Sequence, residues 1–383
     1  MSIEHLPANL RRIRAARRLT QTAAAAAAGL SRSAYRKIEE GGVQPRGRTL
    51  EAIAAALRVQ PRDLVEAAPT MKSVRFRSRT ALKSRSQIVA EAGRRLADYN
   101  QLEALVGAQR PYRLSTIAAS ARTGSVRPES IARAARAALE LSPREAIRNI
   151  CGLLDSAGIK VFAIPVATQS FFGMSIGRMD GGPAIVVNTW DRVSVERWIF
   201  TAAHELGHLL LHHDDYDVRA TAEDPSHEHE ADAFASEFLM PDEVFQQEWR
   251  DTSGLPLVER VVKLKRMFHV GYRTILARLA TTPAEWRSVW KRFHEHYRRN
   301  HGSGSSIDSG KLLSTETGFR ELAPAALRGN EPDQLSASDF REDRLAGLVR
   351  KAVEHGDISL PRGAEILGLT LRDMRSISSS WYG

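Results

Sequence analysis

Two histidines and a glutamate lie close together in the segment His204-Glu205-Leu206-Gly207-His208. On a helix, residues four apart lie on one face about one turn apart, so both imidazoles can hold one metal ion. Glu205 would then lie beside a metal-bound water and could act as its general base. Because the flanking residues are mostly apolar, polar side chains on this helix need partners. We therefore favour a zinc-dependent hydrolytic centre over two hydrogen-bonded core histidines.

A catalytic zinc ion normally takes three protein ligands and keeps one position for water, so a third donor is needed. The chain has a single cysteine, Cys151, which excludes a thiolate-rich cluster and leaves histidine and carboxylate as donors. An acidic block at 227–241 predicts a helix that ends at Pro241. Glu230 lies at the start of that helix beside its apolar stripe and is a candidate ligand. The alternatives in the same block are Glu228, His227 and His229.

The elements before the motif predict a small sheet. Residues 158–165, 171–178 and 184–188 have the pattern of strands, with Asp180-Gly181-Gly182 as the turn between the last two. The helix that carries the histidines begins near Val195. A sheet edge beside such a helix can receive an extended substrate.

Further polar residues lie near the motif. His212, His213 and Asp215 form a second cluster that could bind another metal or lie in solvent. Glu237, seven residues after Glu230, could orient a histidine ligand from behind.

The N-terminal region has the features of a helix-turn-helix. Residues 9–18 predict a helix with Leu10 and Ile13 on one face and arginines on the rest. Thr20 can cap a second helix, and a short turn at 29–31 leads to a third helix over 32–39. Leu50, Ile53, Ala54 and Leu57 predict a further helix that closes the core.

The string Thr-Gln-x-x-Ala-Ala-x-x-x-Gly-Leu-Ser-x-x-x-Tyr-x-x-Ile-Glu-x-Gly, starting at Thr20, resembles the lambda repressor/Cro-like helix-turn-helix family, also called XRE. The resemblance covers roughly residues 5–66. It implies that Gln21 contacts a DNA phosphate and that the start of the 32–39 helix faces the major groove. The implied contacts there are Arg32, Ser33, Arg36 and Lys37. A protein-binding role for this domain is the alternative.

The segments at 196–212 and 230–241 together resemble the ImmA/IrrE family of zinc metallopeptidases, over roughly residues 150–280. This resemblance implies His204, His208 and Glu230 as ligands of Zn²⁺ and Glu205 as the general base. It also implies a role, because members of the family relieve repression by cutting a partner repressor.

The net charge of +10 is unevenly distributed. Residues 1–100 hold 20 Lys or Arg against 8 Asp or Glu, whereas residues 201–250 hold 2 against 13. A basic region suits polyanions and an acidic region suits cations. No apolar stretch approaches the length of a membrane span, and the N-terminus lacks the apolar segment of a signal peptide, so we expect a cytoplasmic protein.

The predicted fold is α+β and mostly helical, with a zincin-like core around a small β-sheet. We expect a helix-turn-helix DNA-binding domain at 1–68, a basic linker and helical connector at 69–145 and a metallopeptidase domain at 146–280. A helical and flexible linker at 281–330 and a C-terminal helical domain at 331–383 follow, the linker being polar and glycine-rich at 301–310. The nearly neutral C-terminal unit favours docking or dimerisation over a second DNA contact.

These patterns predict a homodimeric regulator that binds operator DNA and cleaves a repressor or antitoxin-like partner, or itself. The alternative is a DNA-binding regulator, or an antitoxin, whose zinc site is structural or sensory and never cuts.

Overall fold

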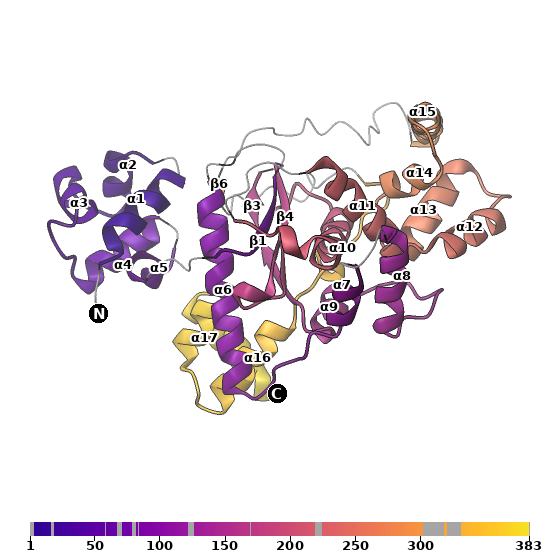
Figure 1. The fold of residues 1–383 in the computed structure, drawn as a ribbon. Helices are drawn as coiled ribbons and strands as arrows, with labels where there is room; N and C mark the ends of the chain where they lie inside the picture. The colour runs from indigo at the N-terminus through magenta and orange to yellow at the C-terminus, as the bar shows by residue number, and fades with distance from the viewer. Residues whose placement is uncertain are drawn as a thin grey trace.

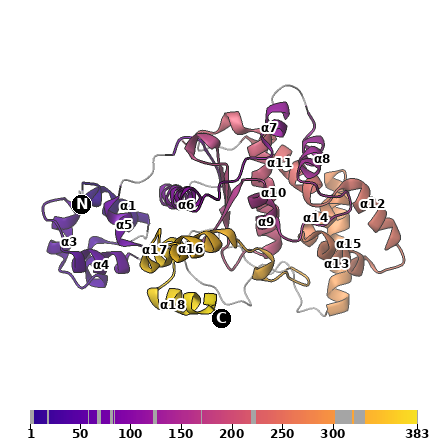
Figure 2. The ribbon, with the colours of Figure 1, turned by 90° about the horizontal axis from the view of Figure 1, so that it is seen from below.

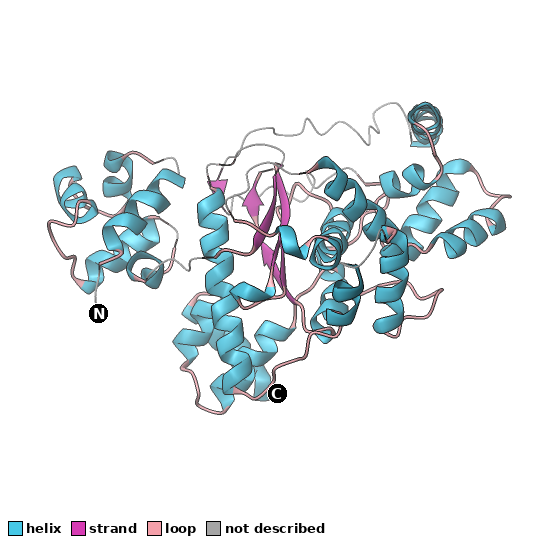
Figure 3. Ribbon diagram, viewed as in Figure 1, coloured by secondary structure: helices cyan, strands magenta, loops and turns pink. Residues whose placement is uncertain are grey.

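The computed structural model describes residues 4–382 except 17–18, 58, 67–70, 79–81, 83, 122–125, 169, 219–223, 302–317 and 320–330. Most of the glycine-rich stretch expected at 301–310 lies outside the described residues. Figure 1 shows a helical N-terminal unit, a central sheet with helices around it, and a helical C-terminal unit. Figure 3 shows how few strands accompany the helices, so the predicted α+β class is confirmed.

The N-terminal unit is a five-helix domain around its own apolar core. Its helices are α1 (Leu6–Ala16), α2 (Gln21–Ala27), α3 (Arg32–Glu39), α4 (Gly47–Ala56) and α5 (Pro61–Val65). Thr20 and Ser31 cap α2 and α3 through their side chains, as the sequence indicated. Gly29, between these helices, has a φ of +67°, a left-handed conformation that favours glycine.

The central sheet has four strands in the order β1-β4-β5-β2. They are β1 (Val74–Ser78), β4 (Phe171–Ile176), β5 (Ala184–Asn188) and β2 (Lys160–Ile164). β2 is parallel to β5, and the other neighbours are antiparallel. A short pair, β3 (Val166–Ala167) and β6 (Gly318–Phe319), lies beside it. β2, β4 and β5 are the predicted strands, whereas β1 lies in the segment expected to be a basic linker.

Alternate side chains of the sheet belong to two different cores. Phe162, Met174 and Val186 pack with α6 (Arg85–Leu105), while Val161, Ile185 and Val187 pack with the helices on the other face. Figure 2 shows α6 and α10 (Val195–Leu211) on opposite sides of the sheet. The segment expected to be a linker and connector is therefore part of the central domain, because β1 adds a strand to the sheet and α6 covers one of its faces.

The other helices of the central part of the chain lie on the same side of the sheet as α10, opposite α6. They are α7 (Ser115–Ala121), α8 (Pro128–Ala138), α9 (Ile150–Ser156), α11 (Pro225–Leu239), α12 (Asp242–Asp251), α13 (Leu257–Phe268), α14 (Tyr272–Arg278) and α15 (Pro283–His301). α9 begins at Ile150, where the side chain of Asn149 accepts a hydrogen bond from the amide of Gly152. No helix within the described ranges is long and apolar enough to cross a membrane.

The C-terminal unit consists of α16 (Arg344–Glu354), α17 (Leu360–Leu367) and α18 (Leu371–Ser379). Leu345, Leu348 and Val349 belong to the same core as α6, so this unit docks on the central domain.

Ion pairs connect the N-terminal domain to the rest of the chain. Arg62 lies 2.6 Å from Asp98 of α6 and 2.9 Å from Glu365 of α17. Arg94 of α6 lies 2.7 Å from Asp63. α6 is thus a support for both terminal units.

Candidate metal centre

The metal centre forms where α11 crosses α10. A Cβ on Gly207 would lie 3.1 Å from Cδ1 of Phe234 and 3.3 Å from Cα of Ala231, so a larger residue would require α11 to move by a few tenths of an ångström. The Gly207 of the motif therefore has a packing role. It allows the first turns of α11 to reach the two histidines.

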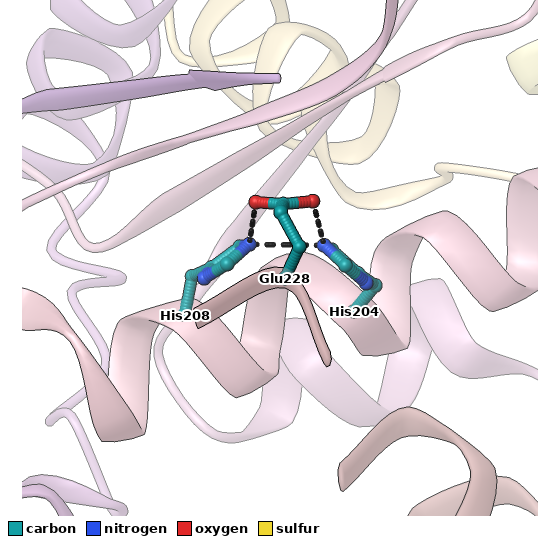
Figure 4. A group of neighbouring side chains, drawn as sticks. All are labelled: His204, His208 and Glu228. Carbon is teal, nitrogen blue, oxygen red and sulfur yellow. Dashed lines mark hydrogen bonds and ion pairs between the residues drawn. The ribbon is translucent and has the colours of Figure 1, made fainter. Parts of the chain in front are cut away.

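Three donor atoms converge above α10 (Figure 4). The Nε2 atoms of His204 and His208 are 2.9 Å apart, and they lie 3.3 and 3.1 Å from the two carboxylate oxygens of Glu228. Two donors bound tetrahedrally at about 2.05 Å from a zinc ion lie about 3.4 Å apart, and the three separations here are somewhat shorter than that. Among the described residues, His204, His208 and Glu228 are the three side chains whose ligand atoms lie close enough together to hold one metal ion. Two imidazoles and a carboxylate are a donor set suited to zinc.

The carboxylate at this point differs from the one expected. Glu228 lies between the two histidines, whereas Oε2 of Glu230 lies 2.8 Å from Nε2 of His212. Side chains two residues apart on a helix point about 200° apart, so both glutamates cannot face α10 in the same way. The structure therefore favours Glu228, one of the alternatives in the acidic block, over Glu230 as the third ligand.

The other nitrogen of each histidine also has a partner. Nδ1 of His204 lies 2.7 Å from Oδ1 of Asp232, and Nδ1 of His208 lies 2.9 Å from Nδ1 of His212. His212 continues this chain to Glu230. Such partners fix the tautomer and the orientation of ligating imidazoles.

Glu237 does not orient a histidine as expected. Its carboxylate binds Arg133 at 3.1 Å and Arg278 at 2.9 Å, and it accepts a hydrogen bond from the amide of Asp242. Glu237 therefore connects α11 to α8 and α14. Asp232, four residues after Glu228, occupies the position behind His204.

Glu205 lies beneath β4. Ser175 donates a hydrogen bond of 2.8 Å from its Oγ to Oε2 of Glu205, and Tyr216 donates to the same Oγ at 2.7 Å. A Cβ on Gly173 would lie 2.5 Å from Cγ2 of Thr201 and 3.1 Å from Oε1 of Glu205. The glycine thus lets the strand approach α10 closely, and Ser175 fixes the carboxylate beside the metal position.

Burial and hydrogen bonds shift the pKa values of the side chains in the centre. It lowers the pKa of His208 well below its usual value and lowers the pKa of His212 as well. Burial alone would raise the pKa of Glu228, but hydrogen bonds from His204 and His208 outweigh it and hold the pKa of this carboxyl far below its usual range. Neutral imidazoles and an ionised carboxylate are the forms that bind a divalent cation.

The remaining predicted polar residues lie around this centre. The ring of His227 stacks on His212 with centroids 4.1 Å apart, and His229 is exposed. His213 lies 3.4 Å from Asp214, and Asp215 lies 3.9 Å from His227. His213 and Asp215 thus lie at the rim of the centre, whereas His212 is buried against His208.

The predicted DNA contacts lie on the surface of α3. Arg32, Ser33, Arg36 and Lys37 are all exposed. Gln21 is half-buried and donates a hydrogen bond of 2.5 Å to Glu39, which is also 2.8 Å from Arg14. The DNA contact of Gln21 remains a prediction, and within the protein this side chain connects α2 to α3.

Sequence reasoning missed Asp232, Ser175 and Tyr216. A spacing of four residues from Glu228 to Asp232 puts both on one face of α11, so this pair was detectable once the helix was assigned. Ser175 and Tyr216 carry no comparable pattern, because they reach Glu205 through the tertiary fold.

Comparisons with known proteins identify two regions. Residues 154–280 match the family model of the IrrE N-terminal-like domain, and residues 10–64 match that of the helix-turn-helix. No curated protein matches the chain. The two resemblances seen in the sequence, to an XRE-type helix-turn-helix and to the ImmA/IrrE family, are confirmed.

Proposed function

We propose that this chain, which joins an XRE-type helix-turn-helix to an IrrE N-terminal-like domain, is a DNA-binding regulator with a zinc-dependent endopeptidase centre. His204, His208 and Glu228 hold the metal, and Glu205 is the general base. The observation that carries the proposal is the convergence of these three donors from two helices, with Glu205 fixed by Ser175 beside them.

Each residue has a defined part in the chemistry. A zinc ion bound here supplies Lewis acidity and lowers the pKa of its water to about 7. Glu205 accepts the proton of the attacking water and passes it to the leaving amine. Ser175 holds the Oε2 atom of Glu205, while Asp232 and His212 hold the two ligand rings.

The exposed face of α3 supports the DNA-binding half of the proposal. Arg32 and Ser33 begin the helix at the position where this class of domain meets base edges, and Arg36 and Lys37 follow one turn later. We propose that two copies of the chain bind the two half-sites of an operator. By family resemblance, the substrate is a repressor or antitoxin-like partner.

One observation favours the alternative of a regulator that never cuts. The exposed fractions of His204, Glu205 and His208 are all 0%, and a peptide bond must reach these residues to be hydrolysed. A sensory or structural zinc site has no such need.

The decisive experiment is cleavage of the repressor encoded beside the gene. The full chain, loaded with zinc, is incubated with that repressor, and fragments are identified by mass spectrometry. We expect a fragment that disappears with a chelator and with Glu205→Gln, although this variant retains its zinc. Glu243→Gln, on the exposed surface of α12, is the matched control and should cleave normally.

Absence of cleavage by wild-type protein with stoichiometric zinc would support the non-catalytic alternative. Cleavage that persists in Glu205→Gln would remove Glu205 from the mechanism.

A further inference from the structure

β1 fills the edge of the sheet that lies over the metal centre. It comes from residues 74–78, outside both matched regions, and pairs antiparallel with β4 from Val74 opposite Ile176 to Arg77 opposite Gly173. In the order β1-β4-β5-β2, β4 would be the edge strand if β1 were absent. Because Ser175 of β4 donates a hydrogen bond to Glu205, this edge is the one beside the proposed general base.

Arg75 extends from β1 into the centre. It is paired with Ser175, so the two side chains share the face of the sheet that looks toward α10. Its guanidinium lies 3.4 Å from Oε1 of Glu228 and 3.4 Å from Nδ1 of His227. Figure 4 shows the carboxylate of Glu228 pointing from α11 toward the strands. A cationic side chain thus sits against the proposed ligand carboxylate.

Two further contacts hold the strand in place. The backbone amides of Lys72 and Ser73 donate hydrogen bonds of 2.8 and 2.6 Å to Oδ2 of Asp180. Phe76 stacks on Phe171 with ring centroids 4.8 Å apart, on the face of the sheet that packs against α6. The strand is therefore anchored at its start and along its buried side.

An extended peptide that adds to a sheet edge forms the same backbone pairs as a native strand. The segment Val-Arg-Phe-Arg-Ser has the alternation of such a peptide, and Arg75 supplies a positive charge opposite the carboxylate of Glu228. His204, Glu205 and His208 are fully buried, which fits an arrangement in which the substrate edge is occupied.

We infer that residues 74–78 form an inhibitory strand that occupies the substrate edge of β4 in cis, and that substrates are extended segments with an arginine opposite Ser175. This inference rests on the proposed endopeptidase function. The strand must leave β4 before a partner segment can pair there.

Peptide binding tests the strand without relying on cleavage. The probe is a fluorescent peptide of residues 72–78, added to the full-length chain and followed by anisotropy. We expect weak binding to the wild type, and at least about tenfold tighter binding to Phe76→Ala, because loosening the strand frees its edge. A peptide carrying Arg75→Ala should lose this gain.

A reversible lock provides the second variant. Val74→Cys combined with Ile176→Cys places two thiols at directly opposite positions of an antiparallel pair, a separation that a disulfide can span. Oxidation should abolish peptide binding and dithiothreitol should restore it. Wild type treated with the same oxidant is the control, because its Cys151 is buried.

The outcomes separate this inference from the proposed function. Tighter peptide binding by Phe76→Ala, lost on locking, supports the inhibitory strand even if no protein is ever cut. Equal peptide binding by the wild type, Phe76→Ala, the locked and the reduced chain overturns it, whether or not the wild type cleaves its repressor. If Phe76→Ala fails to fold, judged by circular dichroism, the locked and reduced states decide the question alone.

Discussion

Helix α3, which carries the proposed DNA contacts, and helices α10 and α11, which carry the proposed metal ligands, place these side chains in opposite surroundings. Arg32, Arg36 and Lys37 are exposed on α3, which Ser31 caps and whose Tyr35 and Ile38 pack in the N-terminal core. His204 and His208 are fully buried, and each contacts a side chain from α11 or from the end of α10.

This difference in burial determines how many other interactions a single substitution disturbs. A surface contact can be lost without disturbing the helix that carries it, since its side chain has few protein partners. A side chain of the buried centre, by contrast, can be a proposed metal ligand, fill space in the core and hydrogen-bond its neighbours at the same time. We therefore expect large and coupled effects in the centre and small, separable ones on α3.

The sharpest test of the centre compares Glu228→Gln with Glu230→Gln. Removal of the carboxylate between the two Nε2 atoms should weaken zinc binding more than about 100-fold, beyond the range found for outer partners. Glu230→Gln should cost about tenfold at most, because Glu230 acts through His212. Competition with a zinc chelator measures both constants. The reverse order would restore Glu230 as the ligand.

Asp232→Asn probes the support of His204. The carboxylate 2.7 Å from Nδ1 fixes the ring, so its loss should weaken zinc binding by about 10- to 100-fold. Asp214→Asn, an exposed acidic residue at the rim, is the control for charge alone. Equal affinities of the two variants for zinc would show that Asp232 contributes only its charge.

Arg32→Ala addresses the exposed side of the comparison. If Arg32 reads a base edge, operator affinity should fall by about 1–3 kcal/mol while the melting temperature stays unchanged. Fluorescence anisotropy with operator and with scrambled DNA measures affinity and specificity. Arg292→Ala, at an exposed position of α15, removes the same charge elsewhere and should leave both values near wild type. A lower melting temperature of Arg32→Ala would instead mean that Arg32 also stabilises the fold, which would contradict the expected independence of surface contacts on α3.

Ser31→Ala should have the smallest effect. The hydroxyl of Ser31 caps α3 by accepting from the amide of Ala34 at 3.2 Å, and loss of such a cap costs about 1 kcal/mol of unfolding free energy. Urea denaturation of the variant, compared with Ser33→Ala, measures this cost. Ser33 is exposed and caps no helix, and its hydroxyl lies 3.1 Å from that of Ser31, so its substitution should cost less stability than loss of the cap.

Local patterns in the sequence predicted most of the elements. Caps at Thr20 and Ser31, the turn at Gly29 and the alternation in β4 and β5 act over a few residues, so the sequence displays them directly. β1 was missed although Val74, Arg75, Phe76 and Arg77 alternate, because a basic run between domains also fits a solvated linker.

The sequence by itself determined that His204 and His208 share one face of a helix with Glu205 between them, because a helical repeat fixes the relation of residues four apart. Only the tertiary structure decided that Glu228 rather than Glu230 meets them, and that β1 covers the centre. The rotation of α11 about its axis depends on its contact with Gly207, and the partner of β4 depends on chain far away in sequence. Both the rotation of α11 and the pairing of β1 with β4 depend on residues far apart in sequence, so no periodic pattern in the sequence could predict them.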